Sequence, residues 1–146
     1  MNNNIDYYDQ YAHEFLDNTF EVNMDNLYQP FLQYLPEYGR ILDVGCGSGR
    51  DALYFHNLGF VVDAFDYSKS LVQLAKEKTG LDIQYNSFYD LDVENEYDGI
   101  WSCASLLHCE RSRLLEVIQK IITALKINGV CYVSFKYGDQ DRTKDG

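Results

Sequence analysis

Apolar positions along the chain alternate between two spacings, which predict helices and strands in turn. Apolar residues three and four positions apart predict helices at 7–18, 24–35, 50–57, 68–78 and 110–126. Short apolar runs predict strands at 41–44, 60–65, 81–85, 97–104 and 130–135. Strands that alternate with helices pair in parallel through right-handed crossovers. The pattern therefore predicts a single α/β domain with an open, doubly wound, mostly parallel sheet.

Breaker and capping residues mark several of these boundaries. Gly59 is expected to end the third predicted helix, and Ser68 to cap the fourth. The last and longest helix carries Leu125 on its apolar face, and Asn128–Gly129 then turns the chain into the final strand. Pro30 is expected to kink the second helix or to lie in its first turn.

The charge balance narrows the class of ligand. The chain has 12 basic and 23 acidic residues, a formal net charge of −11. Phosphate backbones and anionic membrane surfaces are bound by basic residues, so neither nucleic acid nor a membrane is an expected partner. A neutral or cationic small molecule fits this charge better.

Targeting and cysteine signals add little further chemistry. The opening MNNNIDYYDQ has neither the basic nor the apolar segment of a secretory signal, and no apolar run is long enough to span a bilayer. The four cysteines are far apart without a CxxC pair, so neither a zinc site nor a disulfide framework is expected. We therefore expect a cytoplasmic protein without a metal site.

The stretch ILDVGCGSGRDA carries the strongest chemical signal. A buried strand runs into a loop with glycines at 45, 47 and 49, and a helix follows. Glycines are needed where backbone turns sharply and approaches a ligand, and a ligand-free turn would normally need only one. A dinucleotide fingerprint, GxGxxG, would place its third glycine where Arg50 stands, and the GxxxxGK[ST] pattern of a phosphate loop is absent.

An acidic residue lies at a suitable distance from this loop. Asp66 follows the next predicted strand, about twenty residues beyond the glycines, where a carboxylate can accept hydrogen bonds from both hydroxyls of a ribose. Dehydrogenases share this feature, so Asp66 alone does not identify the ligand. The alternative is that Asp66 is a turn or helix-capping residue.

The pattern DxGxGxG, with Asp43 at its head, resembles the first motif of class I S-adenosylmethionine-dependent methyltransferases. The stretches GSGRDALYF, DYSKSLVQLA, YDGIWSCASLLH and YVSFKYG are similar to small bacterial enzymes of the tellurite-resistance type, and the resemblance covers about Tyr7 to Tyr137. It implies a Rossmann-like sheet and methyl transfer from S-adenosylmethionine, with S-adenosylhomocysteine as product. The acceptor would be a small molecule that the sequence does not identify.

The resemblance, together with the loop chemistry, assigns a set of cofactor-binding residues. These are Asp43, Gly45, Cys46, Gly47, Gly49, Arg50, Asp66, Tyr67, Ser68, Ser87, Phe88, Cys103 and Tyr11. Ser87 stands where the family usually has an acidic residue. His108 is the candidate for contact with the acceptor or for moving a proton, and a partly buried histidine that opens the next helix is its alternative.

Several of these assignments have a structural alternative. Arg50 either pairs with the cofactor carboxylate or the substrate, or forms an ion pair with Asp51 or Asp43. Cys46 is expected to fill the tight turn, although a thiol near a helix N-terminus can also be reactive. Phe88 either walls the adenine or packs in the core.

Two aromatic residues have similar alternatives. Tyr11 either faces the cofactor or packs on the sheet. Trp101 is expected in the core.

The resemblance also predicts the organisation of the chain. Residues 1–38 would form helices over the pocket, 39–137 the cofactor-binding core, and 138–146 a polar tail. The family's sheet has seven strands in the order 3-2-1-4-5-7-6, and this sequence stops shortly after the fifth. The sheet is therefore expected in the order 3-2-1-4-5, as a shortened form or a fragment, with an exposed edge that a second copy of the chain could cover.

Two further functions remain open from the sequence. The chain could bind the cofactor without turnover, because the missing strands usually help to shape the acceptor side. It could also be a nicotinamide-dependent dehydrogenase, which Arg50 at the third fingerprint position disfavours.

Overall fold

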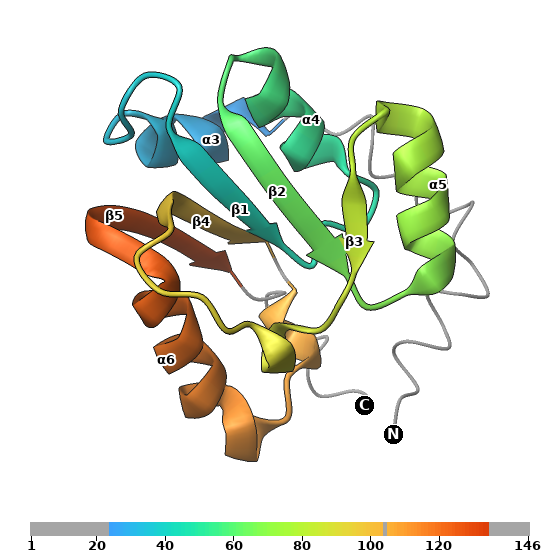
Figure 1. The fold of residues 1–146 in the computed structure, drawn as a ribbon, viewed down its shortest axis with the longest axis vertical. Helices are drawn as coiled ribbons and strands as arrows, with labels where there is room; N and C mark the ends of the chain where they lie inside the picture. The colour runs from blue at the N-terminus through green and yellow to red at the C-terminus, as the bar shows by residue number, and fades with distance from the viewer. Residues whose placement is uncertain (1–23, 104, 135–146) are drawn as a thin grey trace.

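The computed structural model describes residues 24–103 and 105–134, which contain one five-stranded sheet (Figure 1). The strands are β1 (Arg40–Val44), β2 (Val61–Asp66), β3 (Ile83–Tyr85), β4 (Tyr97–Cys103) and β5 (Leu125–Ser134). They pair in the order β3-β2-β1-β4-β5, and every pair is parallel. The fold class and the strand order predicted from the sequence are therefore confirmed.

Helices cover both faces of this sheet (Figure 1). The helices α3 (Asp25–Leu32), α4 (Arg50–Asn57) and α5 (Lys69–Thr79) lie on one face, and α6 (Leu114–Ala124) lies on the other. Three short 3₁₀ helices complete the described residues, namely η1 (Phe88–Asp90), η2 (Leu106–His108) and η3 (Arg111–Arg113).

The pleat of β1 decides which of its side chains meets which layer. Successive strand side chains point to opposite faces. Leu42 and Val44 are buried in the cluster that includes α6, whereas Ile41 packs with the aromatic residues of α3 and α4. Asp43 therefore points to the α4 side, directly beneath the loop that connects β1 to that helix.

The same alternation places the tryptophan of β4. Trp101 is fully buried and stands opposite Asp43 in the parallel register of β1 and β4. Its indole packs among aromatic rings on the α3 and α4 side, with centroids 5.0 Å from Phe31 and 5.3 Å from Phe55. The expectation that Trp101 belongs to the core is confirmed.

Most of the predicted boundaries agree with the structure within two residues. Ser68 caps α5, since its side chain accepts a hydrogen bond from the backbone N–H of Leu71. Gly59 follows α4 at φ +103°. Pro30 lies inside α3 rather than in its first turn, and the helix ends two residues later.

The junction between α6 and β5 differs from the prediction. Leu125 was expected on the helix, but it begins β5 and pairs with Tyr97. The register then shifts, so that Gly99 pairs with Val130. Asn128, at φ +71°, lies in this irregular segment and not in a turn before a separate strand. Backbone pairing with β4 therefore outweighs the helical spacing of Leu125.

Parts of the predicted organisation lie outside the described residues. These include the helix expected at 7–18, with Tyr11, and the tail at 138–146. Within 24–103 and 105–134, no helix is both long and apolar enough to cross a membrane.

Candidate functional site

The loop between β1 and α4 owes its shape to its glycines. Gly45, Gly47 and Gly49 have φ angles of +70°, +55° and +83°, a region that residues with a side chain rarely enter. The N–H of Gly49 donates to the carbonyl of Cys46 at 2.9 Å, and the N–H of Cys46 donates to Phe65 of β2, also at 2.9 Å. The loop is thus a tight turn tied to the neighbouring strand.

Gly45 is also required by a close approach. A Cβ atom at this position would lie 2.4 Å from the Cβ of Ser105, far inside van der Waals contact. The hydroxyl of Ser105 donates to the carbonyl of Val44 at 2.7 Å. Gly45 therefore lets the segment after β4 close against the loop after β1, which brings the carboxyl ends of the two strands together.

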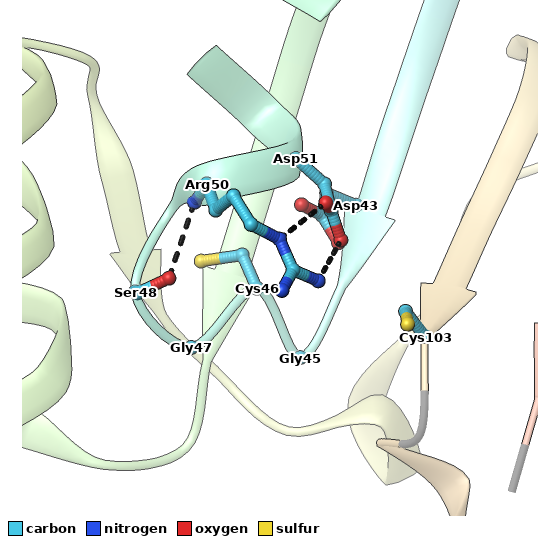
Figure 2. Close-up of a pocket in the computed structure, with 8 residues that line it drawn as sticks. All are labelled: Asp43, Gly45, Cys46, Gly47, Ser48, Arg50, Asp51 and Cys103. Carbon is cyan, nitrogen blue, oxygen red and sulfur yellow. Dashed lines mark hydrogen bonds and ion pairs between the residues drawn. The ribbon is translucent and has the colours of Figure 1, made fainter. Parts of the chain in front are cut away.

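A pocket of about 360 Å³, part of it open to solvent, lies at this junction (Figure 2). It is lined by Asp43, Gly45, Cys46, Gly47, Ser48, Arg50, Asp51 and Cys103. Six of these eight residues are in the predicted set of cofactor-binding residues, and the other two are Ser48 and Asp51. Open α/β sheets bind ligands at the carboxyl ends of their strands, and this pocket has that position.

Asp66 joins the loop from the end of β2. Its Oδ2 accepts a hydrogen bond from the N–H of Gly47 at 2.8 Å. The cap of α5 is Ser68, so capping that helix is not the role of Asp66. Among the predicted cofactor-binding residues, Asp43 and Cys103 line the pocket and Asp66 contacts its loop, whereas Phe88 does not line it.

Asp51 has a full set of donors. Its Oδ1 accepts from the hydroxyl of Tyr28 and from Nε of Arg50 at 2.8 Å. Its Oδ2 accepts from Nε1 of Trp101 at 2.8 Å and from Nη2 of Arg50 at 3.2 Å. The ion pair between Arg50 and Asp51, one of the two expected roles of Arg50, is therefore present, and Asp51 is only 6% exposed.

Asp43, unlike Asp51, does not have hydrogen-bond donors for both of its oxygens. Its side chain is 2% exposed, and its Oδ2 has no hydrogen-bond partner. Burial raises the pKa of this carboxyl, and the charges of Asp51 and Asp66 raise it further, against the opposing effects of Arg50 and the N–H of Ala52. The pocket thus holds a buried acceptor that a cationic donor would satisfy.

Two thiols complete the lining. Burial raises the pKa of Cys46, and the charges of Asp43 and Asp66 add to the effect. Burial also raises the pKa of Cys103, with a further contribution from Asp51. Both side chains are therefore neutral at physiological pH, and the expectation that Cys46 fills the turn agrees with this environment.

The other predicted residues lie elsewhere at this edge of the sheet. Ser87 caps η1 through the N–H of Tyr89 at 3.1 Å, and Phe88 packs partly buried against the core on the α6 side. Tyr67 is 45% exposed and stacks on Tyr85 with ring centroids 5.3 Å apart.

His108 lies in η2, and it does not line the pocket. Burial lowers its pKa to about 4, so its imidazole is neutral at pH 7.

The sequence did not single out Asp51 as a pocket residue. An acidic residue in the first turn of a helix is common for electrostatic reasons, so its type gave no sign of burial. Tyr28 and Trp101, which donate to it, are 23 and 50 residues away. The pairing appears only when three elements are assembled.

Comparisons with known proteins agree with this geometry. A family model described as a methyltransferase domain matches residues 41–129. The chain is 30% identical over 96 residues to a probable S-adenosyl-L-methionine-dependent methyltransferase TehB of Haemophilus influenzae. This alignment covers 62% of this chain and 33% of that protein. It is 29% identical over 91 residues to an uncharacterized methyltransferase of Staphylococcus carnosus, which covers 62% of this chain and 44% of that protein. The chain thus spans less than half the length of these two relatives.

A solved structure extends the comparison of the fold. The 1,6-didemethyltoxoflavin-N1-methyltransferase of Burkholderia thailandensis, solved with bound 1,6-didemethyltoxoflavin and S-adenosylhomocysteine, aligns with a TM-score of 0.72 at 22% identity. The alignment covers 92% of this chain and 62% of that one. At this level of identity, the similarity concerns the fold.

Proposed function

This chain belongs to the methyltransferase domain family, and we propose that it transfers the methyl group of S-adenosylmethionine to a small-molecule acceptor. The observation that carries the proposal is the unpartnered Oδ2 of Asp43, buried beneath a glycine loop of the family's pattern. The cofactor has an ammonium group and a sulfonium, and a buried carboxylate without a partner suits a cationic ligand. The donor and acceptor chemistry of the pocket therefore fits this cofactor.

The amino-acid end of the cofactor would lie between two residues of opposite charge. Asp43 would accept hydrogen bonds from the ammonium group, and Arg50 would donate to the carboxylate. Both side chains line the same pocket. The hydrogen bonds of Arg50 to Asp51 engage the Nε and Nη2 edge of its guanidinium and keep the side chain at the pocket wall. Gly45, Cys46, Gly47 and Gly49 would supply backbone that approaches the ligand without obstruction.

The nucleoside would lie toward β2 and β3. Asp66, fixed by the N–H of Gly47, would accept hydrogen bonds from the ribose hydroxyls. Tyr67 and Phe88, which follow the ends of β2 and β3, would flank the adenine, together with Ser68 and Ser87. Tyr11, which was also predicted to bind the cofactor, lies outside the described residues.

Methyl transfer from this cofactor requires little acid–base catalysis by the protein. When bound, the cofactor supplies a methyl group on a positively charged sulfur, which is already activated for in-line displacement. The residues of the pocket need to orient this carbon and exclude water. The neutral thiol of Cys103 would line the methionine side of the cofactor without competing as a thiolate nucleophile. A base such as His108 would be needed only for an acceptor that arrives protonated.

The net charge of −11 favours a neutral or cationic acceptor over nucleic acid or an anionic membrane. We place the protein in the cytoplasm.

A second copy could pair with β5, which is the edge strand of the sheet in the described residues. Light scattering at high protein concentration tests this pairing, and a strict monomer would refute it.

The test of the function uses two measurements on the same preparation. Calorimetric titration with S-adenosylhomocysteine should give saturable one-to-one binding, and incubation with methyl-labelled S-adenosylmethionine and a panel of small acceptors should label at least one. Binding without any transfer would favour a cofactor-binding module, an alternative suggested by the share of its relatives that the chain spans. Tight binding of NAD with no response to S-adenosylhomocysteine would instead show a dehydrogenase.

A further inference from the structure

The two buried carboxylates on the α4 side of the pocket differ in how their oxygens are used. Asp43 has an oxygen without a partner, whereas both oxygens of Asp51 accept two hydrogen bonds each. The donors come from α3, from α4 and from β4, through Tyr28, Arg50 and Trp101. The hydrogen bonds of Asp51 are therefore all satisfied by other side chains of the protein, and it has no free oxygen to offer a ligand.

A saturated buried carboxylate in this position fixes the residue beside it. Asp51 receives the Nε and the Nη2 of Arg50, a two-point contact that holds the plane of the guanidinium. An unheld arginine side chain loses substantial rotamer entropy when a ligand orders it. Because Asp51 already holds Arg50 at the pocket wall, this loss is incurred on folding and not on binding.

Asp51 has two donors besides Arg50, and these explain why Arg50 can still bind an anionic group while it is paired with Asp51. The hydroxyl of Tyr28 and the indole N–H of Trp101 also donate to Asp51, so its negative charge is shared among three side chains. Burial raises the pKa of Tyr28, and the charge of Asp51 raises it further, so the phenol remains a proton donor at physiological pH. Arg50 is therefore one of three side chains that donate to Asp51.

We propose that Asp51 is a positioning residue that presents the guanidinium of Arg50 to the carboxylate of the cofactor, and thereby sets the preference of the pocket for ligands with an amino-acid end. This inference rests on the proposed function, since it concerns the same pocket. It assigns to Asp51 a role through Arg50 and no contact with the ligand.

The experiment separates the two ends of the ligand. S-Adenosylhomocysteine and 5′-methylthioadenosine share the adenosine and the thioether, but only the first has the amino-acid group. Dissociation constants of both are measured by calorimetry for the wild type and for Asp51→Asn. We expect Asp51→Asn to weaken S-adenosylhomocysteine by about ten- to a hundredfold, the range of a lost charge-assisted hydrogen bond, and 5′-methylthioadenosine by less than about threefold.

A matched control exists toward the other end of the sheet. Asp63 accepts from Nε and Nη2 of Arg40, at 3.2 and 2.8 Å, and from the hydroxyl of Tyr97 at 2.7 Å. Asp63→Asn therefore removes the same kind of arginine and tyrosine contact from a carboxylate that does not line the pocket. We expect Asp63→Asn to lower thermal stability and to leave the ratio of the two dissociation constants at the wild-type value.

Arg50→Lys provides a second route if Asp51→Asn does not fold. Lysine keeps the charge but lacks the two-point contact with Asp51, so the loss should again be confined to S-adenosylhomocysteine. Equal losses for both ligands in either variant, or no loss for either ligand, would overturn the positioning role. A wild-type protein that binds neither ligand would refute the proposed function itself, which distinguishes the two failures.

Discussion

Replacing Asp43 by Asn should stabilise the ligand-free protein and weaken its binding of the cofactor. The side chain is 2% exposed, one of its oxygens lacks a partner, and the charges of Asp51 and Asp66 raise its pKa further. The amide of Asp43→Asn carries no charge, so the variant does not bury a carboxylate close to the charges of Asp51 and Asp66. An unsatisfied buried polar group costs about 1–3 kcal/mol, which is the expected gain in unfolding free energy.

The pH dependence gives the sign of this effect. Burial raises the pKa of Asp43 in the folded state above that in the unfolded chain, so the folded state binds the proton more tightly. The resulting stabilisation is present at low pH and is lost as pH rises through the raised pKa. Asp43→Asn has no such loss, so its advantage over the wild type should be greatest at neutral or higher pH and should vanish near pH 4.

The two assays are thermal unfolding across a pH series and calorimetry with S-adenosylhomocysteine. The melting temperature of the ligand-free variant should rise by several degrees at pH 8, since about 1 kcal/mol corresponds to a few degrees in a domain of this size. The dissociation constant should rise by about ten- to a hundredfold through the lost contact with the ammonium group. A variant that is less stable at pH 8, or that binds as tightly as the wild type, would refute this account of Asp43.

Three further predictions follow from particular contacts. Gly45→Ala should lower the melting temperature and abolish cofactor binding, because the added Cβ would lie 2.4 Å from the Cβ of Ser105. Its control, Gly80→Ala, should cost only the backbone strain of about 1 kcal/mol, because Gly80 has a φ of +75° and an added Cβ there would meet no atom of the described residues within 4 Å. Equal losses of stability in the two variants, measured by circular dichroism, would contradict this. Since burial lowers the pKa of His108 to about 4, stability should fall between pH 6.5 and 4, and His108→Gln should reduce that fall in thermal melts; an unchanged pH profile would argue against its burial. Trp101, the single tryptophan of the chain, donates to Asp51, so cofactor binding should change its fluorescence in proportion to the calorimetric saturation, and a change that does not saturate would exclude this coupling.

The elements that depend on local sequence were predicted well. The strand at 41–44, the glycine loop and the helix from Arg50 all have their determinants within a dozen residues, and the structure has each of them. The cap at Ser68 is equally local, because its hydroxyl needs only a backbone N–H three residues ahead. The sheet order then followed from the alternation of strands and helices, since parallel pairing leaves few topologies.

Prediction failed where backbone pairing between distant segments determines the secondary structure of a residue. The spacing of Leu125 fits the apolar face of α6, yet this residue pairs with Tyr97 of β4. The shift that next pairs Gly99 with Val130 depends on how two segments meet in space. Nothing in the local sequence specifies that register.

The candidate site divides in the same way. The glycines, Asp43 and Asp66 stand in a recognisable spacing, and the structure brings them to one edge of the sheet. The role of Asp51 needs Trp101 from 50 residues away, so its type and position alone could not reveal it. The sequence therefore indicated where a ligand would bind. The packing of α3, α4 and β4 showed how the charged residues of the pocket are held.

The most direct test of the account is a crystal structure of the protein with S-adenosylhomocysteine. The account predicts the ligand in the pocket beneath the glycine loop, with its ammonium group within hydrogen-bond distance of Oδ2 of Asp43 and its ribose hydroxyls on Asp66. A ligand bound elsewhere, or one in this pocket whose ammonium group leaves that oxygen without a partner, would contradict the central claim.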